Sequence, residues 1–250
     1  MTINTLSREA RHLALKQVGA DGQRRIGESS ALLIGVGGIG CAAATYLVSS
    51  GVGRVVMCDF DTVDETNLGR QVLYGPSDVG ELKVAVSAAR LRNTNPAVEV
   101  VAVAERLVGA ELADAVRQAD VVLDCTDNFT TRFQVNDACV AERRRLITGS
   151  AIRLEGQVAV FGPDYHDSPC YRCLYVEADE ALGNCAGNGV LAPVPGVIGT
   201  MMATEALKVL AGVPVTANML HLYDALVSEF RHVSIGKRPE CPACAAGQTK

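Results

Sequence analysis

Residues 31–40, ALLIGVGGIG, form a short apolar run that leads straight into a glycine-rich turn. An Ala-rich stretch of helical character follows at 41–51, and a second apolar run at 54–58 stops at Asp59. This order of strand, glycine turn, helix and strand predicts a βαβ unit with a nucleotide site, because glycines allow close approach to a phosphate and helix N–H groups favour its charge. Asp59 is placed to accept hydrogen bonds from ribose hydroxyls, which suits NAD as well as ATP.

The rest of the pattern extends this unit into a larger sheet. Helical patterns occur at 81–93, 109–118, 130–144 and about 197–211. Strand patterns occur at 98–104, 121–124, 146–151 and 156–161. The last two strands follow each other without a helix between them, which is typical of antiparallel pairing. We therefore expect an α/β fold, a Rossmann-like doubly wound sheet with a parallel N-terminal part and an antiparallel C-terminal extension.

Composition excludes several classes of protein. Of the 250 residues, 48% are hydrophobic and 20% are charged, so a large core can form. The formal net charge of −5 argues against binding to nucleic acid or to an anionic membrane. The N-terminus has no apolar run of signal-peptide length, and nowhere are there about 18 uninterrupted apolar residues. We expect a soluble, cytoplasmic protein.

The nine cysteines fall into two groups. Four stand singly in apolar patterns, where a small buried thiol is expected: Cys41, Cys58, Cys125 and Cys139. Four form two C-x-x-C pairs that fit a tetrahedral zinc site: Cys170, Cys173, Cys241 and Cys244. The long separation of the pairs leaves a redox role open, although neither pair lies in a thioredoxin-like βαβ pattern. Cys185 stands alone between them.

Three charged residues favour ATP over NAD at the predicted nucleotide site. Arg70 and Lys83 follow Asp59, and triphosphate chemistry needs cations to offset charge on the leaving pyrophosphate. Taken singly, each residue type is more often a solvated surface charge. Asp127 follows the strand at 121–124, where its carboxylate suits Mg²⁺; its ordinary alternative role is to cap the next helix.

An ordered set of motifs resembles the MoeB/ThiF family of sulfur-carrier adenylyltransferases, the bacterial relatives of ubiquitin-activating enzymes. The resemblance covers about residues 8 to 245. It rests on DGQ (21–23), GVGGIG (35–40), SSGVGRVVMCDFDTVDETNLGRQ (49–71), ADVVLDCTDN (119–128), GSAIRLEGQVAVF (149–161), SPCYRCL (168–174), GVLAPVPGVIGT (189–200), EALKVLAG (205–212) and CPAC (241–244). The ordered set is far more specific than any single motif.

The resemblance implies an activity and its partners. ATP activates the C-terminal glycine carboxylate of a small ubiquitin-like sulfur carrier of the ThiS or MoaD type, which ends in Gly-Gly. The products are an acyl-adenylate and pyrophosphate, ahead of thiocarboxylate formation with sulfur from a separate donor. One adenylation domain is expected over residues 1–250, with a nucleotide-binding part at about 25–150 and a carrier-binding and zinc part at about 151–250. The pathway that the carrier serves stays open.

The resemblance also assigns roles to positions that match the family motifs. At the nucleotide and its phosphates it places Gly38, Asp59, Asn67, Arg70, Lys83 and Asn128, with Asp127 holding Mg²⁺. Arg11 matches an arginine that enters the partner subunit's ATP site, which implies a homodimer, although its neighbours Glu9 and His12 depart from the family pattern. An exposed arginine on an N-terminal helix is its alternative. The four paired cysteines become a structural zinc site, and Cys185 matches a crossover-loop cysteine that either forms a covalent link to the carrier or is dispensable.

Three other functions compete with this hypothesis. The hypothesis of an NAD-dependent oxidoreductase does not account for Arg70, Lys83 and the four paired cysteines. A noncatalytic carrier-binding scaffold has no need of Arg70, Lys83 and Asp127 together. The tRNA-modifying branch of the same superfamily is disfavoured by the acidic charge and by the paired cysteines.

Overall fold

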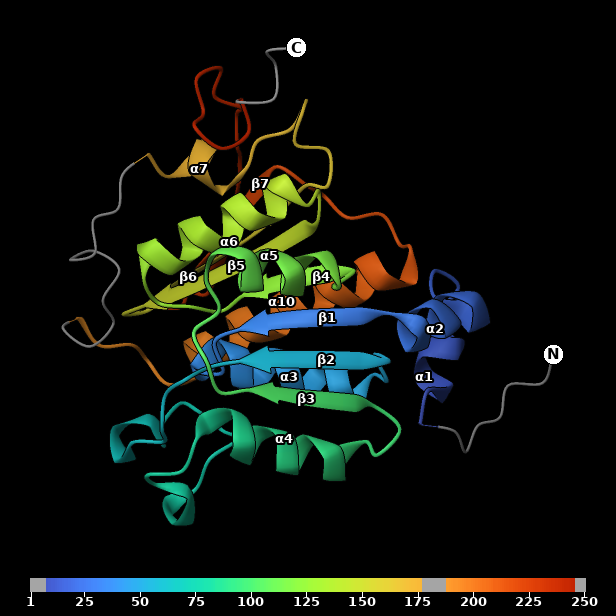
Figure 1. Cartoon of the computed structure of the whole chain (residues 1–250), viewed down its shortest axis with the longest axis vertical. Coiled ribbons are helices and arrows are strands. Elements are labelled where there is room, and N and C mark those ends of the chain that lie inside the picture. Colours follow the sequence, from blue (N-terminus) through green and yellow to red (C-terminus); the bar gives the residue numbers. More distant parts are fainter. Residues whose placement is uncertain (1–7, 177–187, 246–250) are drawn as a thin grey trace.

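An eight-stranded mixed sheet forms the centre of the molecule (Figure 1). The computed structural model describes residues 8–176 and 188–245. The strands lie in the order β3-β2-β1-β4-β5-β6-β7-β8. They span Ser30–Ile34 (β1), Arg54–Cys58 (β2), Glu99–Val103 (β3), Val121–Asp124 (β4), Arg145–Ile152 (β5), Glu155–Phe161 (β6), Met219–Asp224 (β7) and Glu229–Ser234 (β8). Strands β1 to β5 run parallel and β6 to β8 run antiparallel, which confirms the expected fold.

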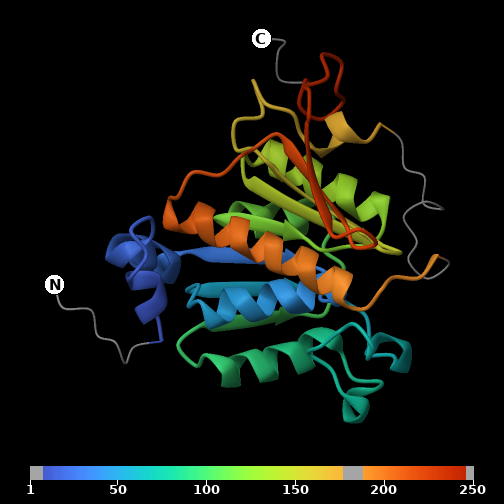
Figure 2. The same cartoon turned by 180° about the vertical axis from the view of Figure 1, so that it is seen from behind.

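Helices cover both faces of this sheet (Figures 1 and 2). They are α1 (Ala10–Leu13), α2 (Gly19–Glu28), α3 (Gly38–Ser49), α4 (Lys83–Thr94), α5 (Gly109–Arg117), α6 (Phe129–Ala141), α7 (Tyr171–Leu174) and α10 (Pro193–Ala211), with 3-10 turns at Glu65–Asn67 and Pro76–Asp78. Helices α3, α4 and α10 share one hydrophobic core, and α5 and α6 share the other. Strand β1 contributes side chains to both cores, because successive side chains of a strand point to opposite faces. Leu33 packs in the first core and Leu32 in the second.

Two helices differ in extent from the sequence-based expectation. Helix α10 begins at Pro193, several residues earlier than expected, because proline is tolerated in the first turn of a helix. Helix α6 ends at Ala141, and the nearby Arg143 has a left-handed φ of 51°. By length and composition α10 could cross a membrane, yet Ile198 and Met202 are fully buried in the core against α3 and β5. It is placed as the core helix of a globular domain.

The β7–β8 hairpin is the part of the sheet that the sequence pattern left unassigned. Strand β8 is exposed along its whole length, and β7 is only half-buried. A strand that packs against little has no strong apolar alternation to read. The hairpin extends the sheet beyond β6. Asp224, at the end of β7, lies opposite Glu155, at the start of β6.

The order of the strands reverses around β1. Strand β2 lies on one side of β1 and β4 on the other, with Ile34 opposite both Cys58 and Asp124. The carboxyl ends of these three parallel strands therefore meet at one edge of the sheet. Ligands of open α/β sheets bind at such a switch point, because the loops diverge there and leave a crevice.

Candidate functional site

A cavity of about 630 Å³ opens at this edge of the sheet. One end is lined by the loops that follow β1, β2 and β4. The cavity continues past the start of α6 to β6, β7 and β8, where Gln157, Leu222 and Tyr223 line it. A single space thus joins the glycine turn to the antiparallel extension.

The glycine turn is built for close approach. Gly35 has a left-handed φ of 91°, and a Cβ there would lie 3.1 Å from the Cys125 carbonyl oxygen. A Cβ on Gly40 would lie 2.1 Å from the carbonyl oxygen of Gly35, so any side chain at this position would break the turn. Gly37 and Gly38 line the cavity at the N-terminus of α3. Backbone N–H groups at a helix N-terminus favour an anion.

Asp59 lies in the cavity wall beside this turn. Its Oδ2 accepts a hydrogen bond of 2.7 Å from the N–H of Val36, and its Oδ1 accepts one of 2.9 Å from the N–H of Asp61. Burial raises the pKa of the Asp59 carboxyl, although these two N–H donors oppose the shift. The structure therefore holds the Asp59 carboxylate between the first two βα loops.

Two cations line the cavity next to Asp59. The side chain of Lys83 is only 8% exposed, and its Nζ lies 2.9 Å from Oδ2 of Asp61, so Lys83 is not a solvated surface charge. Lys83 is the first residue of α4. The Arg70 guanidinium donates to the carbonyl of Thr66 at 2.8 Å and also lines the cavity. The two predicted cations, Lys83 and Arg70, thus lie in the wall of the cavity, and Asp61 is the counter-charge of Lys83.

Gln71 was missed in the sequence, although it directly follows Arg70. Its side chain is only 4% exposed and lines the cavity. Its Oε1 has no hydrogen-bond partner in the part of the chain that the structure describes. A buried amide oxygen without a partner carries a free-energy cost, so Gln71 is held in the cavity wall at some expense to stability. The only sequence signal for Gln71 was its place beside Arg70 at the end of the motif at 49–71.

The loop after β4 brings Asp127 and Asn128 to the cavity. Asn128 caps α6, since its Oδ1 accepts from the N–H of Thr131 at 2.9 Å. The cap that was the alternative role for Asp127 is therefore filled by its neighbour, and the exposed Asp127 carboxylate faces solvent at the cavity. Asp124, at the end of β4, is fully buried and accepts hydrogen bonds from the N–H and hydroxyl of Thr126.

Three predicted residues do not join this group. Asn67 is not among the cavity-lining residues; its Oδ1 accepts from the N–H of Asp64 at 3.3 Å in a capping box. Arg11 is exposed on α1, and α1 lies at the opposite edge of the sheet, by the amino ends of the strands (Figure 1). Cys185 lies outside the described residues.

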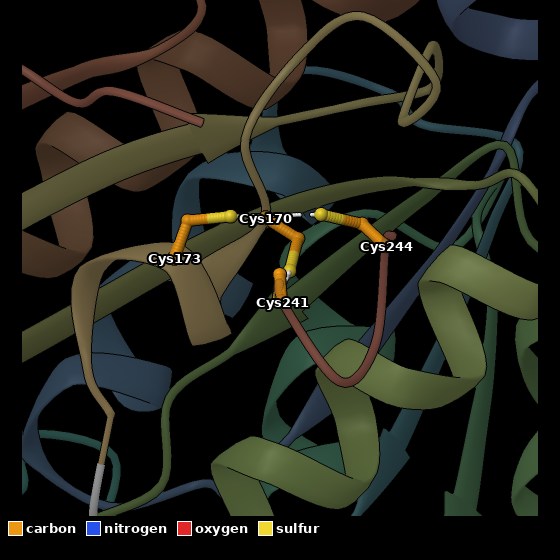
Figure 3. Close-up of side chains that lie close together, drawn as sticks. All are labelled: Cys170, Cys173, Cys241 and Cys244. Carbon is orange, nitrogen blue, oxygen red and sulfur yellow. Dashed lines mark hydrogen bonds between the residues drawn. The ribbon is translucent and has the colours of Figure 1, made fainter. Parts of the chain in front are cut away.

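Away from the cavity, the four paired cysteines meet in one buried cluster (Figure 3). Their Sγ atoms all lie within 4.8 Å of one another, with Cys170 3.6 Å from Cys241 and Cys173 3.5 Å from Cys244. Figure 3 shows the four side chains converging from α7 and from the C-terminal loop. The four single cysteines are buried as expected.

Each sulfur of the cluster faces an N–H donor. Cys170 faces the Asn136 amide at 3.7 Å, Cys173 the Arg238 backbone N–H at 3.4 Å, and Cys244 the Lys237 ammonium at 3.1 Å. Burial raises the pKa of Cys170 and of Cys244. Burial also opposes ionisation of Cys241, but the backbone N–H groups of Ala243 and Cys244 and the neighbouring thiols of Cys170 and Cys244 together lower its pKa to about 7. Donors around all four sulfurs suit thiolates, and a closed set of four thiolates is the ligand set of structural zinc.

The sequence profile of the ThiF family matches residues 9–243. The chain belongs to the ThiF family. This ThiF-family chain is 43% identical over 237 residues to the sulfur carrier protein ThiS adenylyltransferase of Escherichia coli, covering 95% of the chain and 94% of the relative. It is 42% identical over 236 residues to the E. coli molybdopterin-synthase adenylyltransferase, with 94% of each covered.

Longer relatives carry the same region. The chain is 45% identical over 246 residues to the adenylyltransferase and sulfurtransferase MOCS3 of Sus scrofa, which covers 97% of the chain but 54% of that protein. It thus spans about half the length of the MOCS3 relatives. Among solved structures, E. coli MccB with ATP superposes with a TM-score of 0.82 over 97% of this chain and 75% of MccB, at 22% identity. That likeness shows the fold of the ThiF-family domain.

Proposed function

We propose that this ThiF-family protein adenylylates the C-terminal glycine carboxylate of a small ubiquitin-like sulfur carrier, using ATP and releasing pyrophosphate ahead of thiocarboxylate formation. The observation that carries the proposal is the single cavity that joins the glycine turn, two cations and Asp127 to the exposed end of the sheet. Relatives that match nearly their whole length to the chain are named adenylyltransferases of sulfur-carrier proteins or of molybdopterin synthase.

ATP fits the residues at the first end of the cavity. The N-terminus of α3 supplies anion-binding N–H groups at a turn where Gly35 and Gly40 leave no room for a Cβ. Lys83 and Arg70 add positive charge where a triphosphate would lie. Hydride transfer from a nicotinamide has no use for this pair, so the oxidoreductase alternative is disfavoured.

The chemistry needs positioning and charge stabilisation more than a side-chain nucleophile. A carboxylate oxygen of the carrier attacks the α-phosphorus of ATP, the bond to the bridging oxygen breaks, and pyrophosphate leaves. Lys83 and Arg70 stabilise the charge that develops on the leaving group, and Asp59 holds the ribose. Asp127 offers a hard oxygen ligand for Mg²⁺, which when bound neutralises phosphate charge. A noncatalytic scaffold would not need these groups together.

The second end of the cavity is proposed to take the carrier. Gln157, Tyr175 and Leu222 line a continuation that suits an extended tail ending in Gly-Gly. Beyond it the β7–β8 hairpin exposes Leu226, which is 75% exposed, together with Val227 and Phe230. Apolar side chains gathered at the mouth of a cavity mark a protein-docking surface.

We further propose a homodimer in which Arg11 completes the partner's site, because α1 lies across the sheet from the cavity of its own chain. Mixing inactive Arg11→Ala and Asp127→Ala subunits, denatured and refolded together, is expected to restore about a quarter of wild-type exchange: half of the dimers are mixed, and each has one complete site. Refolding each variant alone is the control. No recovery in the mixture would contradict a role for Arg11 in the partner's site.

Zinc is proposed as a structural ion of the cysteine cluster, with sulfur for the carrier coming from a separate donor and the reaction taking place in the cytoplasm. The four thiolates would fill a tetrahedral shell and leave no open position for substrate.

ATP–pyrophosphate exchange tests the proposed function. The purified protein is assayed with Mg-ATP, labelled pyrophosphate and a panel of small carriers that end in Gly-Gly, each beside a version lacking the last glycine. Exchange that depends on an intact carrier is expected, because the adenylation step is reversible. Exchange without any carrier, or none with folded and zinc-loaded protein, would contradict the proposal.

A further inference from the structure

We propose that Arg132 is a positioning residue that couples the cysteine cluster to the loop carrying Asp127. The inference rests on the Mg²⁺ role of Asp127 proposed above. Arg132 lies on α6, is only 7% exposed and lines the cavity. A buried guanidinium needs hydrogen-bond partners for its donors, and those partners show what it holds in place.

On one side, Arg132 holds the residue before Asp127. Its Nη2 donates to the carbonyl of Thr126, and more weakly to that of Gly149 at 3.4 Å. Asp124 also binds Thr126, because its Oδ1 accepts hydrogen bonds from the Thr126 N–H at 3.0 Å and from the Thr126 hydroxyl at 2.7 Å. All three polar groups of Thr126 are thus bound, which fixes the backbone from which Asp127 projects.

On the other side, Arg132 reaches the cysteine cluster. Its Nη1 lies 3.4 Å from the hydroxyl of Tyr171, the residue directly after Cys170. Asn136, one turn along α6 from Arg132, accepts from the Tyr171 N–H at 2.8 Å and faces Cys170 Sγ. Residues four apart lie on one helix face, so one stripe of α6 touches both ends of the link.

Packing makes this link stiff. The Tyr171 ring is fully buried among aromatic rings, with centroid distances of 5.9 Å to Phe133, 6.3 Å to Phe161 and 5.0 Å to Tyr175. Helix α7 has only four residues and begins directly after Cys170. An ion that fixes the cysteine sulfurs would therefore also fix Tyr171, and through Arg132 the Asp127 loop.

The test measures ATP binding as a function of Mg²⁺, without any carrier. In zinc-loaded Tyr171→Phe, which keeps the ring but loses the hydroxyl, and in Arg132→Lys, the Mg²⁺ concentration for half-maximal enhancement of ATP binding is expected to rise, by about tenfold in Arg132→Lys. ATP affinity without Mg²⁺ stays unchanged in Tyr171→Phe, whose side chain does not line the cavity, which a general loss of structure would not allow. Arg92→Met, which removes an arginine bonded to the Val100 carbonyl far from the cavity, is the matched control.

A cycle with zinc then tests the coupling itself. Zinc-depleted wild-type protein, shown by circular dichroism to be folded, should show the same shift in Mg²⁺ dependence, and zinc depletion should add no further shift to Arg132→Lys. Equal Mg²⁺ dependence with and without zinc, additive shifts, or unchanged Mg²⁺ dependence in both variants would overturn the inference. Because no carrier is present, failure of the proposed carrier chemistry would leave this readout intact.

Discussion

Asp127→Ala is expected to lower carrier-dependent ATP–pyrophosphate exchange by at least about 100-fold, because the variant loses the proposed Mg²⁺ ligand at the point where phosphate charge develops. Arg70→Ala should cause a loss of similar size, since its guanidinium lines the same cavity. Asp127 is exposed and Arg70 is half-buried, and neither belongs to the core, so the fold should be kept.

The matched control is Asp167→Ala, which removes an exposed carboxylate that pairs with His166 on the surface. That variant should exchange pyrophosphate at the wild-type rate. Near-normal exchange in Asp127→Ala or in Arg70→Ala would reject the Mg²⁺ and phosphate roles assigned to these residues.

Loss of the cysteine cluster is the second large effect. Cys241→Ser is expected to purify without its zinc and to lower the Tm by about 10 °C or more, because the metal is expected to contribute several kcal/mol to folding. Metal analysis of wild-type protein purified without chelator should find one zinc per chain. These values are read by plasma emission spectroscopy and by thermal unfolding followed by circular dichroism.

Cys139→Ala is the control for this variant, because Cys139 is a single buried thiol outside the cluster. It should keep its zinc and lose only a few degrees of Tm through the small cavity left in the core. Wild-type protein that contains no zinc, or a Cys241→Ser variant as stable as Cys139→Ala, would remove the structural role of the cluster.

The fold was predictable because its decisive elements depend on local pattern. The run of 31–40 predicts a buried strand and a tight turn, and the crowding that a Cβ would meet at Gly35 and Gly40 gives the steric reason for glycine there. The hairpin of β7 and β8 was not predictable, because exposed strands carry no strong apolar alternation. The start of α10 was misplaced because two early prolines look like a break although they are compatible with a first turn.

The candidate site was predictable only in part. Motif position brought Asp59 and Lys83 together, and the structure adds that Lys83 is buried against Asp61. Gln71 and Arg132 escaped notice, since neither a glutamine in the loop after Arg70 nor an arginine inside a helix pattern carries a signal of burial. Only the tertiary structure shows that Gln71 is buried in the cavity wall and that Arg132 links Thr126 to Tyr171.

The attack of a carrier carboxylate on the α-phosphorus is tested most directly with ¹⁸O. A carrier labelled in both oxygens of its C-terminal carboxylate is incubated with the protein and Mg-ATP, the acyl-adenylate is cleaved with hydroxylamine, and the released AMP is analysed by mass spectrometry. The attacking oxygen stays on phosphorus when the acyl bond breaks, so AMP should carry one ¹⁸O. AMP without label, or label in inorganic phosphate with ADP as product, would contradict the proposed chemistry.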